Sequence, residues 1–361
     1  MELVLHGVAV PVKAEVAEEE AEVQEGWEEP GPGQDLAGSA SAHPVARGYP
    51  IRLVFPATKL NVQNVVHRWC VDKMRIAVAS GKGGTGKTLV AVNLALSLSV
   101  ENRIQLLDCD VEEPNDHIFI NPEIVRRDPV LIQVPEVDEN NCDYCGKCAS
   151  VCEYHAIAVF ASHILVFPQL CHGCGACTYL CPQKAISEKG REIGVVESGK
   201  AGKVDFVQGK LTVGEALAPP VIREVKKRAR EEGTVIIDVS PGTSCTVVEA
   251  VRGSDFCLLV TEPTPFGLND LGLAVEMVKK LGIPSGVVIN RVSIGDKHIT
   301  DYCKKKGIPI LLRIPLDSSI ARLYSKGIPL VEGMPEWKRR FVGLFHRIME
   351  FSYERGSGVK R

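Results

Sequence analysis

The sequence predicts an α/β protein with a doubly wound, mainly parallel sheet and a small α+β domain inserted into it. Two observations support this prediction. From Met74 onward, buried-strand patterns alternate with helix-length segments, which is typical of a parallel sheet covered by helices on both faces. A block of closely spaced cysteines interrupts the alternation, which resumes near Val204. A chain of 361 residues is long enough for one large domain and one small one.

The composition predicts a soluble protein with a packed apolar core. Apolar residues make up 45% of the chain and charged residues 24%. The net charge of −3 gives no reason to expect nucleic-acid binding. The apolar runs are too short to cross a bilayer, and the N-terminus lacks the basic start and apolar stretch of a secretory signal. We therefore expect a cytoplasmic protein without a transmembrane segment.

The chain divides into four expected parts. Residues 1–73 contain an acidic run from Glu15 to Glu29 and then a stretch of small residues. This composition predicts a disordered extension, or a non-native one if the start was wrongly assigned upstream of Met74. Residues 74–136 and 191–350 are expected to form the discontinuous main domain, residues 137–190 the inserted domain, and residues 351–361 a C-terminal tail.

The expected elements follow from apolar runs and their flanking residues. The helix expected at 219–232 begins with proline, which is tolerated there because the first helical N–H is unpaired anyway. A second helix is expected at 89–99. The strands expected in the main sheet are 75–80, 104–108, 234–238, 256–260, 286–289 and 308–312, and two short strands at 156–160 and 164–167 are expected in the insert.

A glycine-rich loop between the first strand and the first helix matches the phosphate-binding P-loop. Its glycines let backbone N–H groups converge on phosphate oxygens, and the helix N-terminus adds a positive dipole end. Lys87 is expected to neutralise the β- and γ-phosphates, and the Thr88 hydroxyl to ligate Mg²⁺. The sequence thus predicts ATP and Mg²⁺ binding by Gly81, Lys82, Gly83, Gly84, Thr85, Gly86, Lys87 and Thr88.

Lys82, directly after the first glycine, makes this loop resemble the "deviant" KGGxGK loop of the MinD/ParA ATPases, which are related to the nitrogenase iron protein. The resemblance runs from Met74 to about Glu332, without the cysteine block. It implies an ATPase in which two subunits enclose two ATP molecules. It also implies that Lys82 contacts the nucleotide of the partner subunit, so we expect an ATP-dependent homodimer.

The same resemblance implies further site residues. Asp110 matches the switch I aspartate that positions the attacking water, and Asp238 the aspartate that holds Mg²⁺ through water. With Lys82 and Lys87 they form the expected catalytic set. The Gly242 N–H is expected to sense the γ-phosphate. An aspartate at a strand end can also simply cap a loop. The residues that resemble adenine-binding elements are Asn290, Arg291, Pro315 and Asp317.

Eight of the thirteen cysteines form two runs of C-x2-C-x2-C-x3-C, the bacterial two-cluster ferredoxin pattern. It predicts two [4Fe–4S] clusters and a reducing compartment. Zinc could bind C-x-x-C pairs, but one zinc site would leave half of these thiols unused. In the ferredoxin pattern the fourth cysteine of each run serves the other cluster. The expected sets are Cys142, Cys145, Cys148 and Cys181 for one cluster, and Cys171, Cys174, Cys177 and Cys152 for the other.

These features predict an ATP-hydrolysing iron–sulfur protein that couples dimerisation to electron transfer with an unknown redox partner. One alternative is an ATPase that carries or assembles iron–sulfur clusters for a client protein. No C-x-x-C lies outside the ferredoxin block, and this weakens the carrier alternative. Another is a MinD-like positioning ATPase with a redox sensor. The helix near residues 337–348 could then bind a membrane, but packing on its own sheet is the simpler interpretation.

Five cysteines lie outside the two runs. Scattered thiols are usually buried and inert. Cys245 falls in the segment that resembles switch II, so it could pack as a small apolar residue, influence the clusters, or join a site shared between subunits. The others are Cys70, Cys109, Cys257 and Cys303.

Overall fold

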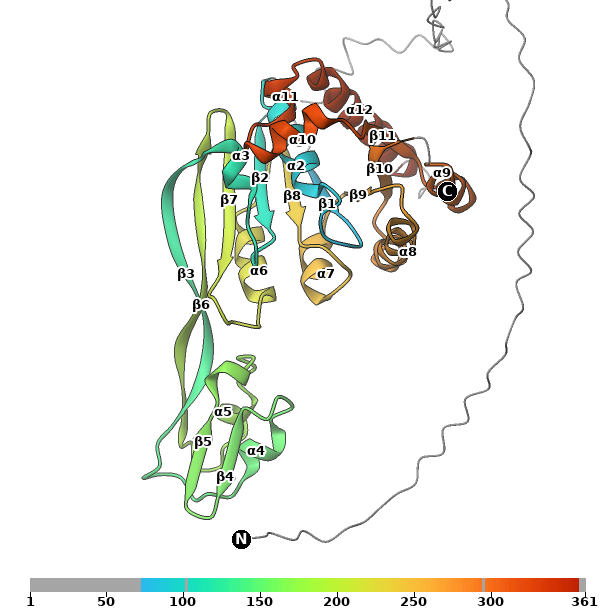
Figure 1. The fold of residues 1–361 in the computed structure, drawn as a ribbon. Helices are drawn as coiled ribbons and strands as arrows, with labels where there is room; N and C mark the ends of the chain where they lie inside the picture. The colour runs from blue at the N-terminus through green and yellow to red at the C-terminus, as the bar shows by residue number, and fades with distance from the viewer. Residues whose placement is uncertain (1–72, 101–102, 294–295, 357–361) are drawn as a thin grey trace, which may run out of the picture. The chain divides into compact units, whose positions relative to one another are not determined.

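The computed structural model describes residues 73–100, 103–293 and 296–356, so the prediction for the N-terminal extension lies outside the described residues apart from Lys73. The main domain is built on a nine-stranded sheet (Figure 1). Its strands, in spatial order, are β11 (Ile310–Pro315), β10 (Ser285–Val292), β9 (Phe256–Thr261), β1 (Met74–Ala79), β8 (Thr234–Val239), β2 (Ile104–Cys109), β7 (Val204–Leu211), β6 (Ile186–Ala201) and β3 (Glu123–Val137).

The strands from β11 to β7 run parallel to their neighbours, whereas β6 and β3 are antiparallel. Strands β2, β8 and β9 are buried along their whole length, which explains why their sequences are mostly apolar. The predicted fold class, a doubly wound and mainly parallel α/β sheet with a small insert, is confirmed.

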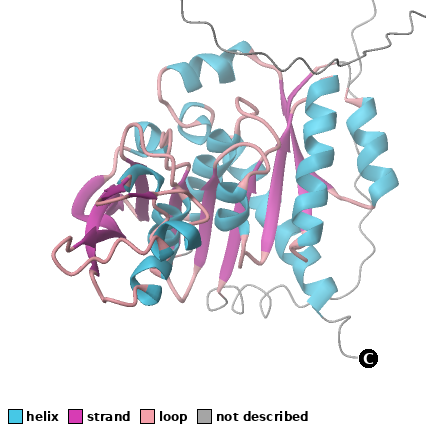
Figure 2. Ribbon diagram, turned by 90° about the horizontal axis from the view of Figure 1, so that it is seen from below, coloured by secondary structure: helices cyan, strands magenta, loops and turns pink. Residues whose placement is uncertain are grey.

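Helices cover both faces of the sheet (Figure 2), and each face has its own apolar core. One core includes α2 (Lys87–Leu98), α3 (Asp116–Ile120), α10 (Ser318–Ser325), α11 (Leu330–Gly333) and α12 (Trp337–Gly356). The other includes α6 (Pro219–Lys227), α7 (Cys245–Val251), α8 (Pro265–Lys280) and α9 (Lys297–Lys306).

The last helix, α12, packs on its own domain. Its apolar residues Trp337, Phe341, Leu344, Phe345 and Ile348 are all buried in the core that contains α2. The simpler interpretation of this segment is therefore confirmed, and its apolar face is not free to bind a membrane. The helix continues to Gly356, beyond the point where a tail was expected. None of the described helices is long and apolar enough to cross a membrane.

Strands β3 and β6 form a long antiparallel ribbon that the sequence analysis did not predict. Their pairing extends from Glu123 opposite Lys200 to Val137 opposite Ile186. The first half of β3 is mostly exposed and the strand contains two prolines, so it lacks the apolar pattern of a buried strand. Prolines are tolerated in β3 because it is an edge strand. The expected domain boundaries at 136/137 and 190/191 fall inside this ribbon and stay predictions.

Beyond the ribbon, the insert contains a two-stranded hairpin and short helices. The hairpin pairs β4 (Ile157–Phe160) with β5 (His163–Val166), close to the expected strands. The helical turns are α4 (Lys147–Val151), η1 (Pro168–Leu170) and α5 (Ala176–Leu180). The insert's apolar core contains only Cys148, Ile157, Ile164 and Ile186 as buried members. So small a core implies that bound metal would contribute much of the insert's stability.

Candidate functional site

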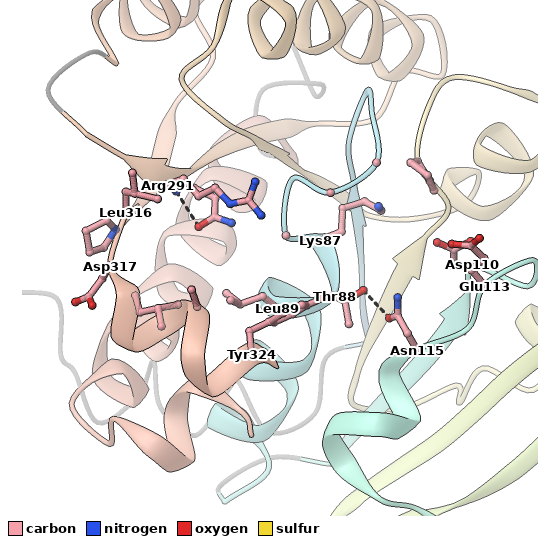
Figure 3. A pocket seen from close by; sticks show the side chains of 18 residues that line it. Lys87, Thr88, Leu89, Asp110, Glu113, Asn115, Arg291, Leu316, Asp317 and Tyr324 are labelled. Atoms are coloured by element: carbon pink, nitrogen blue, oxygen red, sulfur yellow. Dashed lines mark hydrogen bonds between the residues drawn. The ribbon is translucent and has the colours of Figure 1, made fainter. Parts of the chain in front are cut away.

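The P-loop curls between β1 and α2 at the carboxyl edge of the parallel strands, where ligands bind in open α/β sheets. Gly86 caps α2 with a φ of 95°, and a Cβ there would lie 2.3 Å from Asn290 Nδ2. Glycine is therefore required by both backbone conformation and space. The loop borders a cavity of about 360 Å³. Figure 3 shows Lys87 and Thr88 between Asp110 and Glu113 on one side and Arg291, Leu316 and Asp317 on the other.

The Thr88 hydroxyl lies at the centre of a polar cluster. It is 2.6 Å from Asp238 Oδ2 and 2.8 Å from Asn115 Oδ1, either of which can accept its single proton. Burial raises the pKa of Asp238 to about 6, and the Lys87 ammonium and the Thr88 hydroxyl oppose the rise. Hydroxyl, carboxylate and amide oxygens are the ligands that Mg²⁺ accepts, directly or through water. The predicted pair of Thr88 and Asp238 is thus brought together, and Asn115 joins it.

Buried carboxylates fix the loop after β2. Asp108 accepts hydrogen bonds from the backbone N–H groups of Asp110, Asn115 and Asp116, at 3.0 to 3.2 Å. Asp116 is fully buried, and burial followed by the charges of Asp108 and Asp238 raises its pKa well above the ordinary range. Sequence reasoning missed Asn115 and Asp116, although they follow the predicted Asp110 within a few residues.

Asp110 lines the cavity, and its role in positioning the attacking water stays a prediction. Burial raises its pKa, while Lys87 and a hydrogen bond from Ser240 oppose the rise. Gly242 differs from the prediction, because its N–H donates to the Ser80 carbonyl at 2.9 Å and Pro241 lines the cavity instead. That bond closes the loop after β8 onto the end of β1. The Gly242 N–H could reach a phosphate only if the loop moved.

All four residues expected to contact adenine line the other side of the cavity. Asn290 is buried and donates from Nδ2 to the Thr85 carbonyl at 2.8 Å. Asp317 also caps α10 by accepting from the Ser319 N–H at 2.7 Å, so the capping interpretation holds beside its place in the cavity. The sequence did not reveal the apolar and aromatic lining supplied by Leu89, Ile320, Ala321 and Tyr324.

Lys82 does not line the cavity of its own subunit. Its ammonium forms an ion pair with Glu262, a carboxylate that also pairs with Arg291 at 3.1 Å. Gly81 and Thr85 also lie outside the lining. Gly81 is packed so closely that a Cβ there would meet the Asp270 carbonyl oxygen at 2.1 Å. Lys82, the extra lysine of the deviant P-loop, is therefore held away from the phosphate site of its own chain.

The cysteines of the insert surround two cavities. One contains Cys142, Cys145, Cys148 and Cys181, and the other Cys152, Cys171, Cys174 and Cys177. These are the two predicted sets, including the exchange of the fourth cysteine. In the described part of the chain, no three His, Cys, Asp or Glu side chains converge closely enough to hold a single metal ion. Four cysteines around each cavity equal the number of cysteine ligands that a [4Fe–4S] cluster takes.

The two cysteine runs also share their backbone geometry. The Cys142 and Cys171 sulfurs each accept a hydrogen bond from the backbone N–H of the residue two positions later, at 3.4 Å in both cases. The Cys152 and Cys181 sulfurs each accept a hydrogen bond from the backbone N–H of the residue four positions later, at 3.2 and 3.3 Å. Such N–H···S bonds tune the potentials of iron–sulfur clusters. Positive φ angles recur in matching pairs: Tyr144 with Gly173, Gly146 with Gly175, and His155 with Lys184.

The scattered cysteines follow expectation in three cases. Cys109, Cys257 and Cys303 are buried, whereas Cys70 lies outside the described residues. Cys245 is exposed at the start of α7, so its interpretation as a packed apolar residue is wrong. It lines neither cysteine cavity. Its influence on the clusters and its role in a shared site stay predictions.

The fold and the P-loop site together define a nucleotide-binding protein of the P-loop class. Residues 76–330 match the family described as the CobQ/CobB/MinD/ParA nucleotide binding domain. The chain belongs to this family, which confirms the predicted relation to MinD and ParA proteins.

Similar proteins come from several organisms. The uncharacterized protein MJ0579 of Methanocaldococcus jannaschii is 32% identical over 259 residues, which cover 71% of this chain and 91% of the relative. The iron-sulfur cluster carrier protein of Pyrococcus horikoshii is 27% identical over 281 residues, covering 72% and 79%. Among solved structures, the septum site-determining protein MinD of Pyrococcus horikoshii, complexed with Mg-ADP, is 20% identical with a TM-score of 0.47, covering 76% of this chain and 94% of its own.

Proposed function

We propose that this protein hydrolyses ATP as a homodimer and holds two [4Fe–4S] clusters that pass electrons to a partner protein. One observation carries the proposal: a single chain joins a P-loop site to two four-cysteine cavities through a continuous ribbon. Strand β6 pairs with β7 of the ATPase sheet at one end of the ribbon. At the other end Val137 lies opposite Ile186, and these two residues flank the two cysteine runs in sequence. Movement at the sheet therefore has a direct route to the insert.

The chain's own residues suit ATP hydrolysis. Lys87 lies in the cavity where the phosphates would bind, and Asp110 lines the same end, placed to orient an attacking water. Thr88 and Asp238, with Asn115 beside them, would hold Mg²⁺. The bound ion would neutralise the phosphate charge that develops during transfer.

The contacts of Lys82 support its action in the partner subunit. Within its own subunit it is bound to Glu262 and lies outside the cavity lining. An amine held there contributes nothing to its own phosphate site. Docking of a second, ATP-loaded subunit would offer it a phosphate in exchange for the carboxylate, so dimerisation would depend on ATP.

The eight cysteines of the insert would hold the clusters. Four thiols around each cavity match the ligand count of a [4Fe–4S] centre, and the backbone N–H groups directed at four of the sulfurs would stabilise their thiolate form. When bound, such clusters supply one-electron transfer.

A second candidate function is that of an iron–sulfur cluster carrier, because similar proteins bear that name. A carrier must release its cluster. Here each cavity has a full set of four cysteines within one chain, which favours clusters that stay bound. Incubation with an acceptor protein that lacks its cluster discriminates between the two: a carrier would lose iron to it when ATP is added, and a resident redox protein would not.

The proposed cofactor content can be counted. Protein purified without oxygen should contain about eight irons and eight sulfides per chain, the number for two [4Fe–4S] clusters. Metal analysis and visible absorption measure this directly. Stoichiometric zinc in place of iron, with no absorption from sulfide-bridged iron, would contradict the assignment.

A further inference from the structure

A row of polar residues crosses the sheet between the nucleotide site and the ribbon. In the register of the strands, Asp108 on β2 lies opposite Gln208 on β7, and Gln208 lies opposite Glu197 on β6. Glu197 in turn lies opposite Arg127 on β3. One row therefore begins at the carboxylate that fixes the loop after β2 and ends on the two strands that lead to the insert.

Three side chains in this row, those of Gln208, Glu197 and Arg127, are bonded to one another. Gln208 Nε2 donates to Glu197 Oε2 at 2.6 Å. Lys210 and Arg127 lie 3.0 and 3.7 Å from the same Glu197 carboxylate. Glu197 is 7% exposed and Gln208 only 2%. Burial acts against the charge of Glu197, yet Lys210, Gln208 and Arg127 hold its pKa below the ordinary value. A buried charge is costly, and these three partners offset that cost for Glu197.

Helix α3 connects this network to the nucleotide site. The Asp108 carboxylate accepts from the backbone N–H groups of Asn115 and Asp116, where α3 begins, at 3.0 and 3.2 Å. Asp108 also lies opposite Gln208 in the register of β2 and β7. Asn115 contacts the Thr88 hydroxyl at 2.8 Å. A rearrangement around Thr88 that moves Asn115 and α3 therefore acts on Asp108, beside Gln208 in the sheet.

We propose that Gln208 and Glu197 are positioning residues that transmit the nucleotide-dependent movement of α3 to the β3–β6 ribbon, and so to the cysteine insert. The inference rests on the proposed function only in that ATP occupies the P-loop. Gln208 lies between Asp108 and Glu197 in the register of the sheet. Glu197 is bonded by its side chain to both neighbouring strands, so a shift at Gln208 is passed to β6 and β3 together.

Hydrogen exchange of the full-length, iron-loaded protein tests this relay. In the wild type, ATP should change the exchange rates of ribbon amides in residues 126–137 and 186–197 relative to ADP. Gln208→Met breaks the hydrogen bond to Glu197 but leaves Glu197 paired with Lys210 and Arg127. Glu197→Gln keeps the shape of the side chain and removes its negative charge. Both variants should lose at least half of the ATP effect while nucleotide affinity and iron content stay unchanged.

Glu192→Gln is the matched control, because Glu192 lies on the same strand but is exposed and outside the row. It should keep the full ATP effect. A full effect in both Gln208→Met and Glu197→Gln would overturn the relay, as would a wild-type ribbon that does not respond to ATP. If the ribbon responds through the relay but cluster potentials do not change, the relay stands and nucleotide-gated electron transfer fails.

Discussion

Replacing Lys87 by alanine should weaken nucleotide binding by roughly 100-fold, because losing a charge-assisted phosphate contact costs about 3 kcal/mol and each 1.4 kcal/mol is tenfold. Lys82→Ala should behave differently. It should leave most of the nucleotide affinity intact, since Lys82 lies outside its own cavity, yet remove ATP-dependent dimerisation. Hydrolysis should fall roughly 1000-fold, the scale for a cation that acts on the transferring phosphoryl group from a partner.

Fluorescent-nucleotide titration, size-exclusion chromatography and phosphate release measure these three properties. Lys203→Ala is a suitable control, because Lys203 is an exposed lysine in the turn between β6 and β7. It should match the wild type in all three. Normal hydrolysis by Lys82→Ala would show that the two subunits do not complete each other's sites.

Replacing Cys152 by alanine should damage the cluster held by the second cysteine run, not the first. The structure places Cys152 in the cavity of Cys171, Cys174 and Cys177, although it ends the first run in sequence. Iron should fall from about eight per chain to about four, the content of one remaining cluster. Cys181→Ala should remove the opposite cluster, so the spectra of the two variants should show different surviving centres.

Cys245→Ser is the control for this pair, because Cys245 is exposed and lines neither cavity. It should retain full iron. Loss of iron per dimer in this variant, with all eight cysteines of the insert present, would reveal a cluster shared between subunits. Identical spectra from Cys152→Ala and Cys181→Ala would contradict the exchange of the fourth cysteines.

Local motifs predicted the parts of this protein whose chemistry depends on spacing. The P-loop and the cysteine runs are contiguous in sequence, and Lys87, Thr88 and the two cysteine sets lie where the motifs indicate. The buried strands were also predictable, because strands such as β2 and β8 are mostly apolar and are buried along their whole length. Such features need no knowledge of how distant segments meet.

The features that the sequence did not reveal depend on distant contacts. Strand β3 has an exposed, charged first half and pairs with β6 across the whole insert, so no local pattern marks it. Tyr324 reaches the nucleotide cavity only because α10 packs beside the P-loop helix. Gly242 was placed correctly in its loop, but its N–H bond to Ser80 depends on how β1 and β8 lie side by side.

The reduction potentials of the two clusters, measured without oxygen in the presence of ADP and then of ATP, test the central claim most directly. ATP should shift at least one potential by about 60 mV or more, the change that corresponds to tenfold in a one-electron equilibrium. The shift should be absent in Lys82→Ala, which binds nucleotide but cannot complete the dimer. Potentials that are the same with both nucleotides, in protein that dimerises and hydrolyses ATP, would contradict nucleotide-gated electron transfer.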